Sequence, residues 1–138
     1  MDGTQIHIRN RMEEMPAIVS MVEDFGARHH IPPALVNDLN LCLDEVISNI
    51  ISYGYPSGAK GGITVLLSYQ AGQLTTEIRD DGAPFDPLRV NSPDLSGTVQ
   101  TRKVGGLGIY FLRQLMDDVV YNRAGNENRL MLRKNIPV

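Results

Sequence analysis

A long aperiodic stretch, running from Asp80 to Lys103, most constrains the fold of this 138-residue chain. It is rich in Asp, Gly, Pro and Ser, whereas the segments on either side of it have clear helical or strand periodicity. Loops of this length inside a compact domain usually serve as lids or binding segments. The stretch therefore predicts a folded domain that carries a functional loop.

The rest of the chain alternates between strand and helix patterns. Strands are expected at 5–9, 62–69, 74–79, 119–122 and 129–134, and helices at 12–27, 33–53 and 105–117. The last two strands are expected to form a hairpin that turns through Gly125. Because the sequence contains no internal repeat and no interdomain linker, we expect one α/β domain over residues 1–138.

Composition and charge exclude several classes of function. A net charge of −3 and a pI near 5.5 leave no basic footprint for nucleic acid. The first residues lack the pattern of a signal peptide, and no segment approaches the roughly 18 apolar residues of a membrane span, so a cytoplasmic protein without membrane contact is expected. The single Cys42 excludes an intrachain disulfide and a Cys-rich zinc site, and its apolar helical setting predicts a packed thiol.

The helix expected over residues 33–53 carries polar side chains as well as an apolar stripe. Because residues four apart share a helical face, Glu45 and Asn49 should project together, with Asp38 and Ser52, roughly opposite the stripe. The simplest interpretation is a solvated polar face. The chemical alternative is that the Asn49 amide oxygen binds Mg²⁺ and that Glu45 acts as a general base.

A second polar motif follows directly after a strand and reads Arg-Asp-Asp-Gly-Ala-Pro-Phe-Asp-Pro over residues 79–87. Its Asp-Gly and Pro residues are typical of a turn. Alternatively, Asp80 can accept a hydrogen bond from an adenine amino group, while Gly82 lets the backbone approach a flat base. We expect Asp81 to be a solvated turn residue.

A third motif, Lys103-Val104-Gly105-Gly106-Leu107-Gly108-Ile109, opens a helix. Glycines at a helix N-terminus let backbone N–H groups approach phosphates, although glycine-rich turns are common. Arg102 and Lys103 either add positive charge for a triphosphate or lie in a solvated loop. The sequence contains no Walker loop, no metal-spaced His/Cys cluster and no Gly-x-Ser-x-Gly elbow.

In this order, the three motifs resemble the boxes of the Bergerat ATP-binding fold, which groups gyrase, chaperone, histidine-kinase and mismatch-repair ATPases. The segment from Leu43 to Ile51 resembles the N box, and residues 80–87 and 105–109 resemble the two glycine boxes. The Pro-Phe-Asp-Pro ending at 84–87 is similar to the anti-sigma-factor serine/threonine kinases of bacterial partner-switching systems. One departure is Tyr53, which stands where many relatives carry histidine.

The resemblance implies an α/β two-layer sandwich, with helices on one face of a mixed, mostly antiparallel sheet and ATP between the helices and a lid at 91–103. It implies that Glu45 is the base, that Asn49 binds Mg²⁺, and that Asp80 and Gly82 hold adenine. The residues implied at the phosphates are Arg102, Lys103, Gly105, Gly106, Leu107 and Gly108.

The implied reaction transfers the γ-phosphoryl group of ATP to a serine or threonine of a small anti-sigma-factor antagonist. A sigma factor is a second candidate partner, and a homodimer is a candidate assembly. Three other interpretations stay open: a non-catalytic, nucleotide-dependent binding module, a stand-alone histidine-kinase-type ATPase domain, and a purely structural domain in which the motifs are coincidental. The absence of a helical hairpin bearing a phosphoacceptor histidine disfavours the histidine-kinase interpretation.

Overall fold

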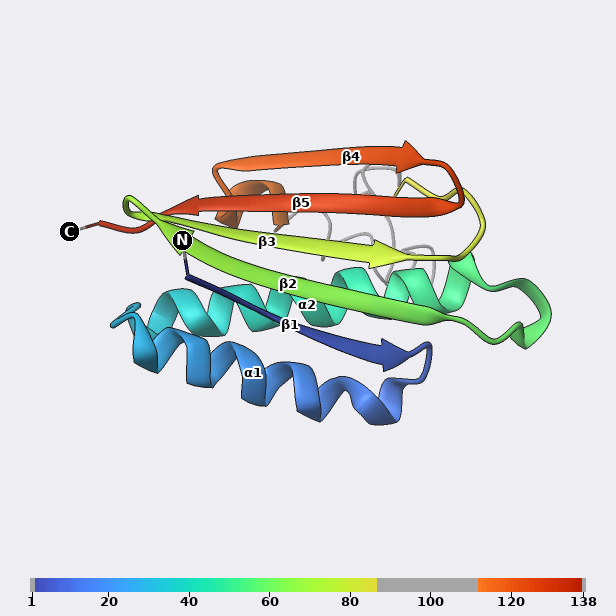
Figure 1. Ribbon diagram of the computed structural model, residues 1–138, viewed down its shortest axis with the longest axis horizontal. Helices are drawn as coiled ribbons and strands as arrows, with labels where there is room; N and C mark the ends of the chain where they lie inside the picture. Colours follow the sequence, from blue (N-terminus) through green and yellow to red (C-terminus); the bar gives the residue numbers. More distant parts are fainter. Residues whose placement is uncertain (1, 87–111, 138) are drawn as a thin grey trace, which may run out of the picture.

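Five strands form one sheet in the computed structural model, which describes residues 2–86 and 112–137 (Figure 1). The sheet order is β1-β2-β3-β5-β4, and the strand bounds are β1 (Asp2–Arg9), β2 (Gly62–Gln70), β3 (Gln73–Asp80), β4 (Asp118–Ala124) and β5 (Glu127–Asn135). Each of the five expected strands is present, and each is one to three residues longer than predicted.

The sheet is antiparallel at each of its four pairings, so the expectation of a mixed sheet is wrong for the described strands. For two of the four pairings the reason lies in the connections. A two-residue turn with Gly72 at φ 78° joins β2 to β3, and a turn with Gly125 at φ 61° joins β4 to β5. Strands joined by such tight hairpins can only pair antiparallel.

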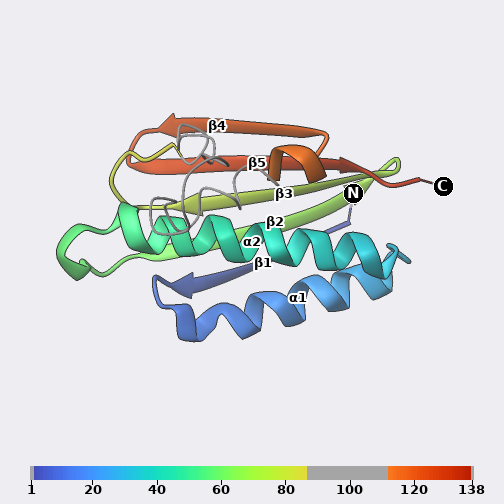
Figure 2. The ribbon, with the colours of Figure 1, turned by 180° about the vertical axis from the view of Figure 1, so that it is seen from behind.

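Two long helices, α1 (Met15–Arg28) and α2 (Pro33–Gly54), cover the same face of this sheet (Figure 2). The predicted helix at 12–27 is divided, because its first three residues form the 3₁₀ turn η1 (Met12–Glu14). A second 3₁₀ turn, η2 (Pro56–Gly58), follows α2. One helical layer on one sheet confirms the expected two-layer α/β sandwich.

The core lies between the two layers and follows the expected periodicities. Inward residues of the strands alternate with outward ones, and the helices contribute residues three and four apart. The largest fully buried apolar side chains are Phe25, Ile18, Leu43, Ile47, Ile63, Leu67, Ile78, Leu112 and Leu132. Cys42 belongs to this core, where burial raises the pKa of its thiol to about 12, so the prediction of a packed thiol is confirmed.

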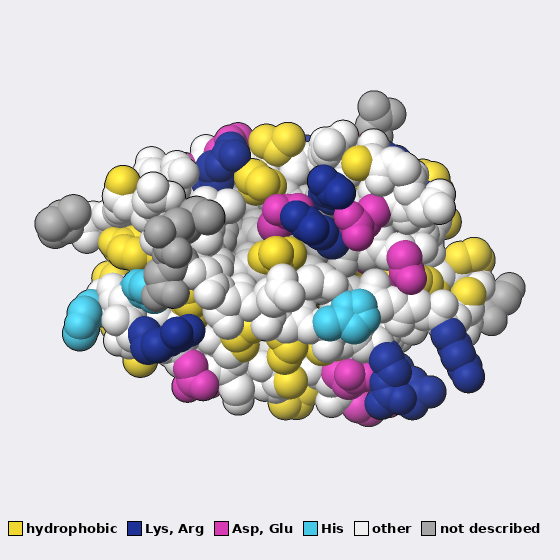
Figure 3. Space-filling model, viewed as in Figure 1, with side chains coloured by type: hydrophobic (Ala, Val, Ile, Leu, Met, Phe, Trp, Pro, Cys, Tyr) yellow, Lys and Arg dark blue, Asp and Glu magenta, His cyan; other side chains and the backbone are white. Residues whose placement is uncertain are grey.

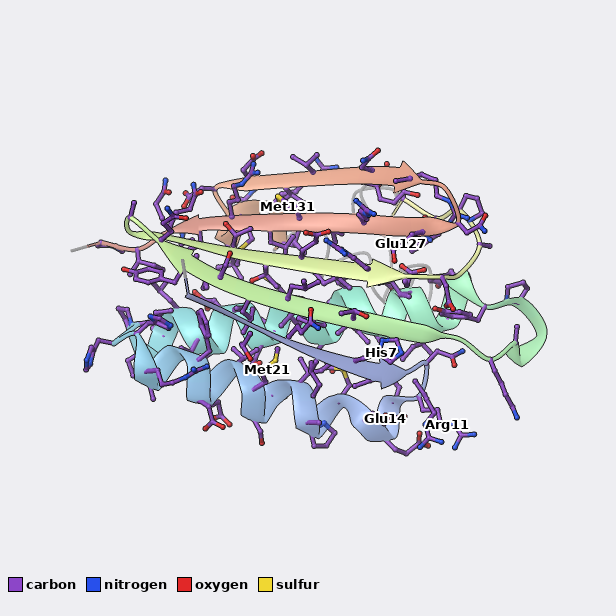
Figure 4. The ribbon with its side chains drawn as sticks, in the orientation of Figure 1. His7, Arg11, Glu14, Met21, Glu127 and Met131 are labelled. Atoms are coloured by element: carbon purple, nitrogen blue, oxygen red, sulfur yellow. The ribbon has the colours of Figure 1, made fainter. Side chains whose placement is uncertain are left out.

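The opposite face of the sheet faces solvent and carries charged side chains with apolar ones among them (Figure 3). Among the described residues, three ion pairs lie on this face: Arg79–Glu77 at 2.6 Å, Arg129–Glu127 at 2.9 Å and Arg133–Asp118 at 3.0 Å. Figure 4 shows two of the outward side chains of β5, Glu127 and Met131. Exposed pairs of this kind contribute little to stability, about 0–1 kcal/mol each. The buried polar groups lie instead on the inner side of the sheet.

Candidate functional site

Asn49 lies in the buried face of α2, not opposite it. Its side chain is 4% exposed, whereas Glu45 is half-buried and Ser52 is exposed. The prediction that these residues share a solvated polar face is therefore wrong. Asn49 follows Val46 by three residues and Cys42 by seven, a spacing that puts it on the core side of the helix.

Two atoms on this side of α2 are buried without a hydrogen-bond partner among the described residues, Glu45 Oε1 and Asn49 Nδ2. Burial, together with the charge of Asp44, raises the pKa of Glu45. The Asn49 amide opposes this shift, because it lies close to the Glu45 carboxylate, although it forms no well-aligned hydrogen bond with it. Leaving buried polar atoms unpaired costs about 1–3 kcal/mol each. Unpaired groups of this kind call for an explanation, and a bound ligand is a common one.

Asp80 is a second buried polar group, 4% exposed at the end of β3. Its Oδ1 atom accepts hydrogen bonds from the Gly82 backbone N–H and from Asn128 Nδ2, both at 2.9 Å. Burial raises the pKa of Asp80, and these two hydrogen bonds oppose that effect. Within residues 2–86 and 112–137, no hydrogen bond reaches Oδ2, so this oxygen remains able to accept one from a ligand.

Asn128 is a functional candidate that the sequence analysis missed. Its Nδ2 also donates to the Ala83 carbonyl at 2.8 Å, and its Oδ1 accepts from the Tyr121 hydroxyl at 2.5 Å and from the Phe85 N–H at 3.4 Å. The alternating pattern of β5 could have identified it, because Asn128 occupies one of the inward-facing positions of this strand. A polar residue in such a position needs buried partners.

We expect Asn128→Ala to lower the free energy of unfolding by about 2 kcal/mol, because it leaves the Ala83 carbonyl and the Tyr121 hydroxyl without their partner and removes a donor to Asp80. Urea unfolding would measure the change. Asn135→Ala is the matched control on the same strand, since Asn135 is exposed and, among the described residues, its side chain bonds only to Gln73, at 3.3 Å. Equal destabilisation by both variants would contradict the role assigned to Asn128.

The segment after β3 is in direct contact with the end of α2. The Ala83 N–H donates to the Gly54 carbonyl at 2.7 Å, and a Cβ atom on Gly82 would lie 2.6 Å from that carbonyl oxygen. A glycine is therefore required at position 82 because the Gly54 carbonyl lies so close to it. This requirement is independent of the predicted contact between Gly82 and a base. At about 1.5 Å of rise per residue, Asn49 lies about 7 Å and Glu45 about 13 Å back along the helix axis from Gly54.

Asp81 is more than the solvated turn residue expected from the sequence. Although the residue is exposed, its Oδ1 accepts a hydrogen bond from the Gly62 N–H at 3.0 Å and lies 2.7 Å from the Tyr55 hydroxyl. Nearby, the exposed ring of Tyr53 lies 5.6 Å from the ring of Phe85. The residue that departs from the family pattern thus packs beside the end of the first glycine box.

The third motif and the expected lid at 91–103 lie outside the described residues. The same holds for all the residues expected at the phosphates, namely Arg102, Lys103, Gly105, Gly106, Leu107 and Gly108, and their roles stay predictions. The helix expected at 105–117 is described only from Leu112. In the part that is described, no three His, Cys, Asp or Glu side chains form a metal-binding group, and no helix has the length and apolar character needed to cross a membrane.

Comparison with known proteins shows which family the chain belongs to. The family described as the histidine kinase-like ATPase domain matches residues 8–134. The chain belongs to this family. Among its solved structures, the RsbU and RsbW domains of a Mycobacterium tuberculosis protein align with 99% of this chain and 32% of that one, at 11% identity and a TM-score of 0.67. A histidine kinase domain from Erythrobacter litoralis aligns with 88% of the chain and 59% of that one, at 19% identity and a TM-score of 0.55.

Curated relatives of this histidine kinase-like ATPase domain include serine kinases. The serine/threonine-protein kinase BtrW of Bordetella bronchiseptica is 32% identical over 94 residues, which cover 68% of the chain and 66% of that protein. The serine-protein kinase RsbW of Listeria monocytogenes is 27% identical over 88 residues, which cover 61% of the chain and 56% of that protein. The matched part of the chain thus spans a little over half to about two thirds of these relatives.

Proposed function

We propose that this chain binds ATP with Mg²⁺ and transfers the γ-phosphoryl group to a serine or threonine hydroxyl of a protein. The observation that carries the proposal is a row of polar groups that begins at the buried Asp80 at the end of β3 and continues along α2. Asp80 lies beside the end of α2, and the unpartnered atoms of Asn49 and Glu45 lie one and a half to two and a half turns back along the helix. An elongated ligand with a base at one end and phosphates at the other fits this order.

Asp80 would hold the adenine base. Its Oδ1 is occupied by Asn128 and Gly82, so its Oδ2 is the atom that would accept a hydrogen bond from the adenine amino group. Both occupied contacts are short and buried, and they fix the orientation of the carboxylate before a ligand arrives. Preorganised groups bind with a smaller loss of entropy than mobile ones.

Asn49 and Glu45 would act at the phosphate end. A half turn of the Asn49 amide exchanges its oxygen and nitrogen and would present the oxygen as a ligand for Mg²⁺. When bound, Mg²⁺ neutralises the charge of the phosphate oxygens. Glu45 would accept the proton of the attacking hydroxyl, and its raised pKa makes it a stronger base than an ordinary glutamate. Arg102, Lys103 and the 105–108 segment would complete the phosphate contacts.

The names of the relatives support the choice of reaction. Both are named as kinases that act on serine, or on serine and threonine. We propose by analogy that the substrate here is a small anti-sigma-factor antagonist, that a sigma factor is a second partner and that the chain can form a homodimer.

A transfer assay with labelled phosphate tests the proposal. The purified chain is incubated with Mg²⁺, γ-labelled ATP and candidate antagonist proteins of the partner-switching class. Label in an acid-stable product that maps to serine or threonine is the expected result. Phosphoserine and phosphothreonine survive acid, whereas phosphohistidine does not, so an acid-labile product would favour a histidine-kinase-type reaction. ATP binding without any transfer would favour a non-catalytic binding module.

A further inference from the structure

The side chain of Asp81 joins three segments of the chain, next to the proposed adenine site. Its Oδ1 accepts a hydrogen bond from Gly62 N–H at the start of β2, at 3.0 Å. The hydroxyl of Tyr55, one residue beyond the end of α2, lies 2.7 Å from the same oxygen and 3.0 Å from the Gly62 carbonyl oxygen. One carboxylate oxygen thus connects the end of α2, the start of β2 and the segment that follows β3.

The charge states of the pair favour a strong hydrogen bond. Burial opposes the charged form of Asp81, but hydrogen bonds from Tyr55 and Gly62 outweigh it, so the pKa of Asp81 is lowered. Burial, and then the hydrogen bond to Asp81, raises the pKa of Tyr55. At neutral pH a neutral phenol therefore donates to a carboxylate, and hydrogen bonds to a charged acceptor are about twice as strong as those between neutral groups.

Gly61 packs closely against both members of the pair. Tyr55 is 6% exposed, and a Cβ atom on Gly61 would lie 2.2 Å from Tyr55 Cε1 and 2.5 Å from Asp81 Oδ1. Asn10 holds this loop from the other side: its Oδ1 accepts from the Gly61 N–H at 3.0 Å, and its Nδ2 donates to the Ala59 carbonyl at 2.8 Å. The Tyr55 ring is therefore buried against a loop that is itself tied by hydrogen bonds.

These contacts link the two ends of the proposed nucleotide site. Helix α2 carries Glu45 and Asn49, and the pair ties the end of that helix to the residue after Asp80. We propose that Tyr55 and Asp81 are positioning residues, which set the distance between the phosphate end and the adenine end of the site without touching the nucleotide. This inference rests on the function proposed above.

Two ligands distinguish a positioning role from a general structural one. Adenosine would use only the adenine end of the site, whereas ATP with Mg²⁺ would use both ends at once. A ligand that spans both ends gains affinity from their fixed separation. A change that lets the distance between the two ends vary should therefore weaken the binding of Mg·ATP and leave the binding of adenosine unchanged.

Tyr55→Phe is the variant of choice, because it removes only the hydroxyl and keeps the ring packed against Gly61. We expect the Kd for Mg·ATP to rise about tenfold and the phosphoryl-transfer rate to fall by at least as much, since a hydrogen bond to a charged group is lost. NMR titration with adenosine should give the wild-type Kd. An equal loss of affinity for both ligands, or no loss for either, would overturn the positioning role.

Asp81→Asn provides an independent test, because the asparagine oxygen can still accept from Tyr55 and Gly62 but carries no charge. We expect a smaller loss of Mg·ATP affinity than in Tyr55→Phe, and a loss in the double variant smaller than the sum of the two. Additive losses would contradict a direct coupling of the two residues. Tyr69→Phe, at the far end of β2, is the control and should bind both ligands as the wild type does.

Binding of Mg·ATP by the wild type shows whether the positioning role alone fails or the proposed function fails as well. If the folded wild type does not bind Mg·ATP, the proposed function fails and the positioning role fails with it. If the wild type binds Mg·ATP and Tyr55→Phe binds it equally well, only the positioning role is overturned.

Discussion

Asp80→Asn should reduce the affinity for ATP by about 100-fold or more, because a site built to hydrogen-bond one group strongly rejects the wrong one. The asparagine oxygen can take the place of Oδ1 and keep the hydrogen bonds from Asn128 and Gly82. Its amide nitrogen then faces the adenine amino group, and two donors meet where a donor and an acceptor met before. Calorimetric titration with ATP measures the loss.

Measuring the stability of Asp80→Asn shows whether a lower ATP affinity comes from the lost adenine contact or from loss of the fold. Burial raises the pKa of Asp80 in the folded state, so the charged carboxylate lowers stability once the pH exceeds the pKa of the unfolded chain. The asparagine variant lacks this penalty. Its stability relative to the wild type should therefore increase as the pH rises above about 4, the ordinary pKa of aspartate, until the pH exceeds the raised pKa of Asp80 in the folded state. A variant that unfolds in urea well before the wild type at pH 7 would contradict this account.

Glu45→Gln should lower the rate of phosphoryl transfer by about 10²–10⁴-fold while ATP affinity stays within about threefold of the wild type, since general base catalysis contributes that much. The glutamine keeps the size of the side chain but cannot accept the proton. Single-turnover transfer and calorimetric binding are the two measurements. If Glu45→Gln lost ATP affinity as well as transfer rate, Glu45 would hold the nucleotide instead of acting as the base.

The pH dependence of transfer gives a second readout for Glu45. Because burial and the charge of Asp44 raise the pKa of Glu45, the rate should fall with decreasing pH at a higher pH than an ordinary glutamate would impose. Asp44→Asn is the matched control: Asp44 is exposed, and removing its charge should shift this acid limb to lower pH without changing the rate on the plateau. An acid limb that does not move would contradict the assignment.

Much of the fold was predictable because its signals are local. The apolar residues of α2 repeat at helical spacing, and Gly54 ends the helix within one residue of the expected position. The Gly125 turn identified the closing hairpin. The mixed sheet was expected from the family resemblance, whereas the short hairpin connections allow only antiparallel pairs.

The partners of the site residues were less predictable, because they come from distant parts of the chain. Asn128 contacts Asp80 across 48 residues of sequence, and Tyr55 contacts Asp81 across 26. No short motif joins the members of either pair. The burial of Asn49 was missed for a different reason: its spacing from Val46 allowed the core side of the helix, but its polar side chain favoured a solvated face.

The most direct test of the central claim is calorimetric titration of the folded wild type and of Asn49→Ala with ATP, each with and without Mg²⁺. We expect the wild type to bind ATP more tightly with Mg²⁺ than without it and Asn49→Ala to lose this difference. Absence of ATP binding by the folded wild type, or an equal benefit from Mg²⁺ in both proteins, would contradict the central claim.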